Sequence, residues 1–198
     1  MTQRMVLASG NAGKLREMRQ LLAGLDIELV AQGDLGVTDA EETATTFVEN
    51  ALLKARHAAR LTGLPALADD SGLCVDALGG APGLYSARFA GVHADHAANN
   101  ARLLRELDGR APDERSAFFI CVVALLHEAD DPAPIIAEGR WRGRILDAPR
   151  GEQGFGYDPL FLPEGQSLSA AELDAALKNR LSHRGQALAR LREGLGAS

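Results

Sequence analysis

Apolar runs alternate with segments of helical periodicity along the first third of the chain. Residues 5–8 form an apolar run that predicts a buried strand, and apolar side chains recur at helical spacing over residues 15–25. Residues 27–30 alternate like a second strand, and a polar loop follows them. Thr46 is followed three residues later by a glutamate, as in a capping box, so we expect a helix that ends at Gly63.

The middle of the chain is dominated by strand patterns. Residues 64–68 predict a short strand that delivers the acidic segment 69–72 on a turn. Residues 117–126 are almost continuously apolar, which is typical of a central strand. Residues 135–145 follow after a connection rich in proline and acidic residues, and we expect the two strands to form an antiparallel hairpin.

Three further segments have helical spacing, namely residues 100–107, 170–176 and 182–195. Residues 151–159 combine glycines with two aromatic side chains, which is more typical of a binding loop than of a plain linker. No repeat or interdomain linker interrupts the pattern. The sequence therefore predicts a single domain over residues 1–198, of α/β class with a mixed, twisted sheet flanked by helices.

Composition narrows the classes of function that this domain can have. A formal net charge of -6 argues against a basic face for a nucleic acid polymer, although a small anionic substrate remains possible in a locally positive pocket. No apolar run approaches a membrane span or the apolar region of a signal peptide. Cys74 and Cys121 are far apart in apolar surroundings, so we expect buried, inert thiols and a cytoplasmic location.

The first candidate site is the loop Ser9–Lys14, which lies between a predicted strand and a predicted helix. Backbone N–H groups at the start of a helix attract phosphate, and Gly10 and Gly13 allow a close approach of the backbone. Ser9, Asn11 and Lys14 add a hydroxyl, an amide and a cation. The spacing is not that of a Walker A loop, and the residues alone are also compatible with a simple strand-to-helix turn.

The second candidate site is acidic. Asp69 and Asp70 are adjacent carboxylates that can hold a hard divalent cation and activate water, a role that suits Mg²⁺. Glu42 can add a third oxygen ligand if its loop folds back to the same place. The alternative is that the aspartates only shape a turn and that Glu42 is solvated.

Two later groups of side chains could recognise a purine. Phe155 and Tyr157 can stack on a base, although ordinary core packing explains them equally well. Lys178, His183 and Arg184 offer hydrogen-bond donors that suit a keto purine, or they form a solvated helix terminus. The remaining histidines show no ligand spacing, and we assign no function to His57, His93, His96 and His127.

Taken in order along the chain, these segments resemble the inosine/xanthosine triphosphate pyrophosphatases, also called non-standard purine NTP pyrophosphatases. The resemblance covers nearly the full chain and is most specific in the segments 46–88 and 154–159. It rests on the segments Ser9–Lys14, Glu41–Thr43, Thr46–Ala51, Lys54–Ala55, Ala68–Leu73, Gly79–Gly83, Tyr85–Arg88, Gly154–Pro159 and Ser182–Gly185. Ser9 stands where many members have threonine, which keeps the hydroxyl.

The resemblance implies an elongated α/β fold of two lobes with a substrate cleft between them, in a homodimer. It implies that the metal is Mg²⁺, held by Glu42 and Asp70 with Asp69 assisting, and that Asp70 is the general base. It assigns phosphate binding to Ser9, Gly10, Asn11, Ala12, Gly13 and Lys14. It assigns the nucleoside pocket to Phe155, Gly156, Tyr157 and Asp158. Substrate binding is completed by Ser71, Lys178, His183 and Arg184.

The activity implied is hydrolysis of ITP, dITP and XTP to the monophosphate and pyrophosphate, which removes deaminated purines from the nucleotide pool. Two alternatives stay open. One is a septum-type pyrophosphatase for modified pyrimidine triphosphates, against which Phe155 and the His183–Arg184 pair argue. The other is a nucleotide-sensing module without hydrolysis, against which the intact carboxylates argue, because a binding module needs no group that activates water.

Overall fold

The computed structural model describes residues 2–196. Six strands in this part of the chain form one sheet in the order β2-β1-β3-β4-β5-β6. Their bounds are β1 Gln3–Leu7, β2 Ile27–Ala31, β3 Ala66–Val75, β4 Ser116–Leu126, β5 Ile135–Ile145 and β6 Phe161–Pro163. β1 pairs in parallel with β2 and β3, whereas β6 runs antiparallel to β5. The sheet is therefore mixed, and the predicted α/β class is confirmed.

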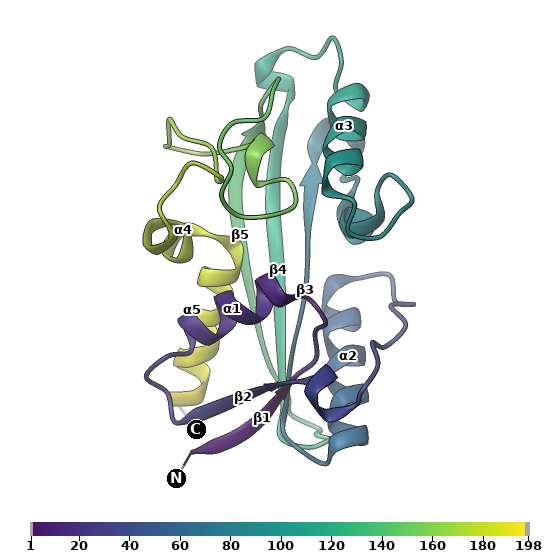
Figure 1. The fold of residues 1–198 in the computed structure, drawn as a ribbon, viewed down its shortest axis with the longest axis vertical. Coiled ribbons are helices and arrows are strands. Elements are labelled where there is room, and N and C mark those ends of the chain that lie inside the picture. The colour runs from purple at the N-terminus through teal and green to yellow at the C-terminus, as the bar shows by residue number, and fades with distance from the viewer. Residues whose placement is uncertain (1, 197–198) are drawn as a thin grey trace. The chain divides into compact units, whose positions relative to one another are not determined.

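The α-helices are α1 Ala12–Leu21, α2 Phe47–Thr62, α3 His96–Glu106, α4 Ala175–Leu181 and α5 His183–Gly196 (Figure 1). Both predicted ends of α2 are confirmed. The Thr46 hydroxyl accepts a hydrogen bond from the Glu49 N–H at 3.3 Å, which caps the helix. Gly63 ends it with a φ of 68°, a left-handed conformation that glycine adopts without strain.

Three of the predicted boundaries are wrong. The acidic segment 69–72 is not on a turn, because β3 continues through it to Val75. The helix expected over 170–176 begins only at Ala175, since the Asp174 carboxylate accepts the N–H of Leu177 at 2.9 Å. The helix expected from residue 100 begins four residues earlier at His96, because Asp95 caps it in the same way through Ala98.

The chain divides into two compact units. Unit 1 comprises Met1–Asp70, Cys121–Gly139 and Arg184–Ser198, and unit 2 comprises Ser71–Ile120 and Arg140–His183. The three long strands β3, β4 and β5 each continue from one unit into the other. The prediction of one domain over residues 1–198 stays a prediction.

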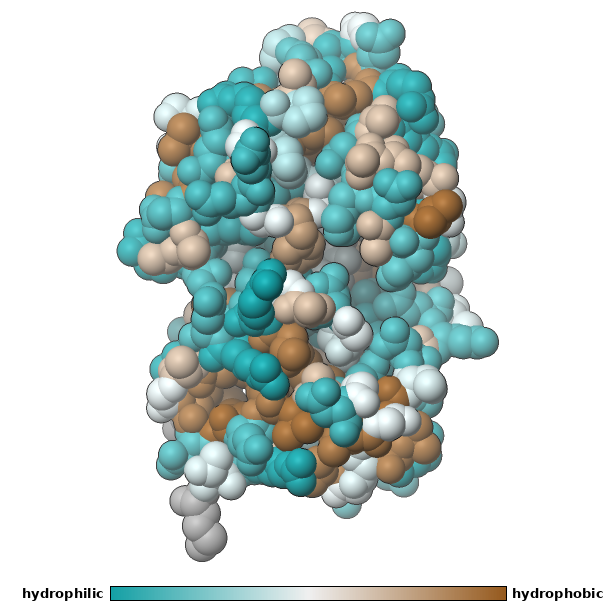
Figure 2. Space-filling model, in the orientation of Figure 1, coloured by the Kyte–Doolittle hydropathy of each residue, from teal (hydrophilic) through white to brown (hydrophobic). Residues whose placement is uncertain are grey.

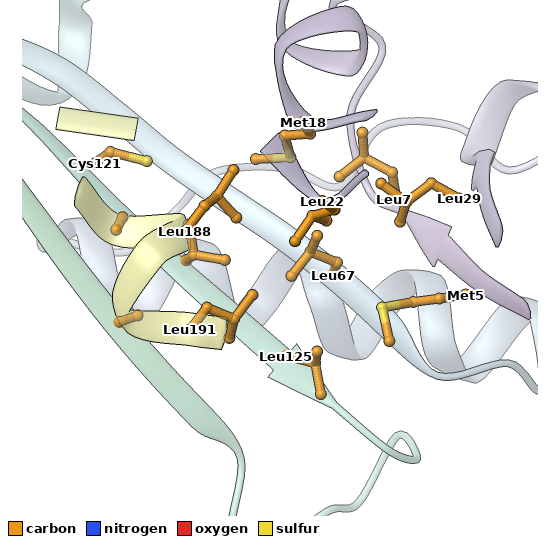
Figure 3. Packing of buried hydrophobic residues seen from close by; sticks show 13 residues of the cluster. Met5, Leu7, Met18, Leu22, Leu29, Leu67, Cys121, Leu125, Leu188 and Leu191 are labelled. Carbon is orange, nitrogen blue, oxygen red and sulfur yellow. The ribbon is translucent and has the colours of Figure 1, made fainter. Parts of the chain in front are cut away.

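The core of unit 1 joins its strands to α1 and α5 (Figure 3). Met18 of α1, Leu22 at the C-terminal cap of that helix, and Leu188 and Leu191 of α5 are buried in the same cluster as Leu67 of β3. Figure 1 shows α1 and α5 beside each other, with α2 on the other face of the sheet. The buried side chains of α2 are mostly alanines, which lets this helix pack closely against the strands: Ala51, Ala55, Ala58 and Ala59.

Aromatic side chains make up much of the core of unit 2. The rings of Phe119 and Phe161 meet edge to face with centroids 4.7 Å apart, and Trp141 lies 5.3 Å from Phe161. Tyr157 belongs to the same buried cluster. This packing holds the end of the glycine-rich loop 151–159 against β4 and β5.

Hydrophilic residues predominate on the face shown in Figure 2, where hydrophobic ones lie in small groups. Large apolar side chains with high exposure include Leu61, Tyr85 and Val92. Within residues 2–196, no helix is both long and apolar enough to cross a membrane. Cys74 and Cys121 are buried as predicted, and burial raises the pKa of Cys121 to about 12.

Candidate active site

The loop Ser9–Lys14 connects β1 to α1 in unit 1 and is shaped by its own polar side chains. The Ser9 hydroxyl accepts the N–H of Asn11 at 3.2 Å. The Asn11 side-chain oxygen caps α1 by accepting the N–H groups of Gly13 at 2.9 Å and Lys14 at 3.1 Å. The loop thus presents the positive end of a helix together with a lysine, as a phosphate site requires.

Lys14 forms one half of a buried ion pair. Its Nζ lies 3.0 Å from Oδ2 of Asp69, whose side chain is fully buried. Arg184 reaches the same oxygen at 3.5 Å and also pairs with Glu17 of α1. Burial opposes ionisation of Asp69, but Lys14 and Arg184 outweigh it and lower the pKa of this carboxyl below its ordinary value. Asp69 therefore fixes the lysine of the loop Ser9–Lys14.

A second charged group lies around Asp70. Lys54 of α2 contacts Oδ1 of Asp70 at 3.0 Å and Oε1 of Glu42 at 2.8 Å. Asn50, one helical turn before Lys54, donates to Oδ2 of Asp70 at 3.3 Å. Burial raises the pKa of Asp70 above its ordinary value, although Lys54 opposes this shift. Burial also opposes the charged form of Lys54, but Asp70, Asp69 and Glu42 outweigh it and raise the pKa of the lysine.

Side chains along β3 point alternately to its two faces, which separates Asp69 from Asp70 although they are adjacent in the sequence. Successive side chains of a strand point to opposite faces, so Asp69 meets Lys14 and Arg184 whereas Asp70 meets residues of α2. The structure brings Glu42 and Asp70 together at the ammonium group of Lys54. Asp69 pairs with Lys14 and Arg184, and its assisting role at the metal stays a prediction.

The donor set of unit 1 fits a hard divalent cation. Glu42 and Asp70 both contact the ammonium group of Lys54, so the two carboxylates face one position of positive charge. Among residues 2–196, no group of three or more His, Cys, Asp or Glu side chains is placed to hold a metal ion. Mg²⁺ is commonly bound by one or two carboxylates plus substrate phosphates, and that arrangement is compatible with two carboxylates here.

The candidate nucleoside residues belong to unit 2, where the loop Phe155–Asp158 is fixed by Asp158. The Asp158 carboxylate accepts the N–H of Phe155 at 2.8 Å and contacts Nζ of Lys178 at 2.7 Å. Lys178 also lies 5.5 Å from the centre of the Phe155 ring. A side chain at Gly154 would come within 2.2 Å of Asp158, so this tight loop needs glycine there.

Tyr157 and Phe155 have different surroundings. Tyr157 is buried in the core, and its hydroxyl donates to the Ser86 carbonyl at 2.8 Å. Burial raises the pKa of this phenol above its ordinary value. Phe155 is only half-buried. Phe155 is therefore the candidate for stacking on a base, whereas Tyr157 anchors the loop to the core of unit 2.

The predicted hydrogen-bond donors belong to different units, and the boundary between the units lies between His183 and Arg184. His183, the last residue of unit 2, stacks on Phe119 with ring centroids 4.8 Å apart. Arg184, the first residue of the next segment of unit 1, is held by Glu17 and Asp69. Ser71 opens unit 2 directly after Asp70 in β3. All of these side chains have partners within the protein: Lys178 pairs with Asp158, His183 stacks on Phe119, and Arg184 pairs with Glu17 and Asp69.

Comparison with known proteins places this arrangement in a family. The sequence profile of the Ham1 family matches residues 5–194. The chain belongs to the Ham1 family. A protein of Xanthomonas campestris named dITP/XTP pyrophosphatase is 62% identical over 193 residues, which cover 98% of this chain and 97% of the relative. A protein of the same name from Halorhodospira halophila is 57% identical over 98% of each chain.

Solved structures of the Ham1 family share the fold. A HAM1 protein from Coxiella burnetii has a TM-score of 0.91 and 50% identity, covering 99% of this chain and 100% of that one. The Ham1 protein of Staphylococcus aureus has a TM-score of 0.87 and 36% identity, covering 98% and 99%. The family resemblance that the sequence motifs indicated is therefore confirmed.

Sequence reasoning assigned no role to several residues that the structure places in these groups. Asn50 and Lys54 are one helical turn apart on α2 and both contact Asp70. The signal that could have found them is a pair of polar residues at i and i+4 on a helix face that is otherwise alanine. Asn100 and His96 of α3 contact the loop Phe155–Asp158 in unit 2 and carried no comparable signal.

Proposed function

We propose that this chain hydrolyses deaminated purine nucleoside triphosphates, namely ITP, dITP and XTP, to the monophosphate and pyrophosphate. The single observation that carries the proposal is that two carboxylates, Glu42 and Asp70, both contact the ammonium group of Lys54. They belong to the same unit as the loop Ser9–Lys14. Relatives that are 57% and 62% identical over 98% of this chain are named dITP/XTP pyrophosphatase, which supports the choice of substrate.

We assign the triphosphate to unit 1. Ser9 to Lys14 bind its phosphates through the start of α1 and through the Lys14 ammonium group. Lys14 neutralises charge on the pyrophosphate that leaves, and Asp69 keeps the lysine in place. Asp69 acts at the site through Lys14 rather than as a ligand.

The metal in this proposal is Mg²⁺, held by Glu42 and Asp70. When bound, it supplies positive charge at the phosphate oxygens. Asp70 orients a water and takes its proton as the water oxygen bonds to the α-phosphorus, while the bond from that phosphorus to the bridging oxygen breaks. The raised pKa of Asp70 fits a base, because a carboxylate with a higher pKa accepts a proton more readily.

We assign the nucleoside to unit 2. Phe155 stacks on the purine, Gly156, Tyr157 and Asp158 shape the loop around it, and Ser71 completes the contacts. Lys178 and His183 donate hydrogen bonds to the 6-oxo group of hypoxanthine or xanthine, and Arg184 is a further donor for the substrate. Adenine carries an amine donor at that position, so the same donors disfavour ATP.

The proposed reaction removes deaminated purines from the nucleotide pool before they enter DNA or RNA. We also propose a homodimer, on the basis of the family resemblance, with no nucleic acid polymer or membrane as a partner. Sedimentation at several protein concentrations tests the dimer, because a monomer sedimenting alone at micromolar concentration contradicts it.

One assay tests the proposed reaction against its competitors. Purified protein is incubated with ITP and Mg²⁺, and pyrophosphate is measured separately from free phosphate. Release of pyrophosphate in step with IMP is expected, and chelation of the metal should stop it. Binding of ITP without release of pyrophosphate would indicate a sensing module instead. Faster turnover of modified pyrimidine triphosphates in a side-by-side panel would indicate the septum-type activity.

A further inference from the structure

The first turns of α3 present two polar side chains to the loop Phe155–Asp158 within unit 2. His96 and Asn100 are four residues apart, so they lie on the same face of the helix. Nδ2 of Asn100 donates to the carbonyl oxygen of Gly156 at 3.0 Å. The ring of His96 lies 6.5 Å from the ring of Phe155, with the planes tilted by 42°. Two different contacts thus connect one helix face to two consecutive residues of the loop.

We infer that His96 and Asn100 are positioning residues for the nucleobase, holding Phe155 and Gly156 in the conformation that stacks on a purine. The inference rests on the proposed function, to which it adds a structural basis for base affinity. Neither residue touches the reacting phosphates, whose proposed ligands all belong to unit 1. Their effect is therefore confined to the nucleoside.

The backbone at Gly156 needs such a restraint. Gly156 has a φ of 64°, and a Cβ built on it would meet nothing within 4 Å. Packing on that side of the residue therefore does not fix its backbone, and the hydrogen bond from Asn100 does. The neighbouring residues have their own anchors, since Tyr157 bonds to the Ser86 carbonyl and Asp158 contacts Lys178.

The chemistry of Asn100 indicates that the donor is the useful part of this side chain. Its Oδ1 is buried and accepts no hydrogen bond from the residues that the structure describes. Burying an acceptor in this way is unfavourable, and an apolar residue of the same shape would avoid it. The amide at this position is therefore explained by what Nδ2 does at Gly156, not by stability.

His96 supports the same loop through its ring. Its distance from Phe155 is within the range at which aromatic rings attract one another. Lys178 also approaches the Phe155 ring, at 5.5 Å, and is itself bound to Asp158. Phe155 is therefore contacted by side chains from two helices, α3 and α4, and its orientation depends on both.

Two nearly isosteric variants of Asn100 test the inference. Both variants remove the N–H donor. Asn100→Asp keeps a polar side chain, whereas Asn100→Leu replaces it with an apolar one. For ITP with Mg²⁺ we expect KM to rise about tenfold, equivalent to about 1.4 kcal/mol of binding, and kcat to stay within about twofold. Inhibition by tripolyphosphate, which has no base, should be the same as in the wild type.

Two variants of His96 test whether its ring is the part that matters, and a variant elsewhere in α3 serves as a control. His96→Ala should raise KM by a smaller factor of about threefold, and His96→Phe should restore it, because the ring is the part that packs. Arg105→Ala, an exposed position in the last turn of the same helix, should leave both KM and the inhibition by tripolyphosphate unchanged.

Two results would overturn the inference. One is an unchanged KM in both Asn100 variants. The other is an equal loss of affinity for ITP and for tripolyphosphate, which would mean a general disturbance of the fold. If the wild-type protein released no pyrophosphate, the proposed reaction would be refuted, and the same variants would still be judged by calorimetric binding of IMP, which needs no turnover.

Discussion

Asp70 meets different side chains through its two carboxylate oxygens. Lys54 contacts Oδ1 and Asn50 donates to Oδ2, so an asparagine would fit the same space but could neither accept the proton of water nor bind a cation as well. We expect Asp70→Asn to lower kcat for ITP by about 10²- to 10⁴-fold, the usual contribution of a general base. Binding of IMP should change far less. Steady-state kinetics and calorimetry measure the two effects.

A matched control for this variant is Asp34→Asn. Asp34 is exposed in the short helix Gln32–Leu35 of unit 1, so its replacement makes the same change of charge away from the candidate site. It should leave kcat unaltered. Near-normal turnover in Asp70→Asn would remove Asp70 from the role of base.

Asp69 has a different role and calls for a different measurement. Its fully buried carboxylate binds Lys14 and Arg184, so Asp69→Asn would remove the buried counter-ion of Lys14 and leave Arg184 paired with Glu17. Breaking a buried pair in this way costs about 3–5 kcal/mol, and we expect the free energy of unfolding at neutral pH to fall by about that amount. Urea unfolding checks it, and a loss below about 1 kcal/mol would contradict the assignment.

The same variant should alter the response to acid. The folded-state pKa of Asp69 is lowered, because Lys14 and Arg184 outweigh the opposing effect of burial. Its contribution to stability is therefore fully present above the pKa of an unfolded aspartate, about 3.9, and is lost as the pH falls toward the folded-state value. The difference in stability between wild type and Asp69→Asn should consequently narrow below about pH 4. A difference that stays constant down to pH 2 would be inconsistent with this linkage.

At the scale of elements, α5 is held to unit 1 by its apolar face. Leu188 is fully buried beside Met18 and Leu67 (Figure 3), so its truncation would leave a cavity in the core. We expect Leu188→Ala to reduce the free energy of unfolding by about 2–5 kcal/mol. Leu61→Ala, in the exposed last turn of α2, should change it by no more than about 0.5 kcal/mol. Equal effects of both variants in urea unfolding would contradict this account of the core.

Local signals predicted elements well where one residue decides a boundary. Thr46 and Gly63 mark the ends of α2 through side-chain capping and a left-handed backbone, and both are readable from the sequence. The strand through Asp69 and Asp70 was not predictable in this way. Two adjacent carboxylates can remain in a buried strand only because Lys14 and Lys54, distant in the sequence, neutralise them from opposite faces.

The candidate site was predictable to a similar extent. Its phosphate loop, acidic residues and aromatic loop follow from motif and resemblance, because each is a short continuous segment. The contact of Glu42 and Asp70 with Lys54 depends on how α2 packs against β3, and the bond from Asn100 to Gly156 joins segments 56 residues apart. The i, i+4 spacing of Asn50 and Lys54 marks two polar residues on α2 but not the carboxylates that they contact, and Asn100 has no such pattern, so neither pairing follows from the sequence alone.

At the scale of the whole molecule, the proposed choice of nucleotide rests on the donors of unit 2, and the proposed hydrolysis rests on residues of unit 1. Lys178 and His183 would face the acceptor oxygen of hypoxanthine but the amine of adenine, so we expect kcat/KM for ITP to exceed that for ATP by at least about 100-fold. Lys178→Met, which keeps the length of the side chain but removes the donor, should narrow the ratio, whereas Arg105→Ala should preserve it. Rates measured with ITP, XTP, GTP and ATP at equal concentration decide the matter. GTP shares the 6-oxo group, so a specificity constant for GTP equal to that for ITP would show that these donors alone do not select the base.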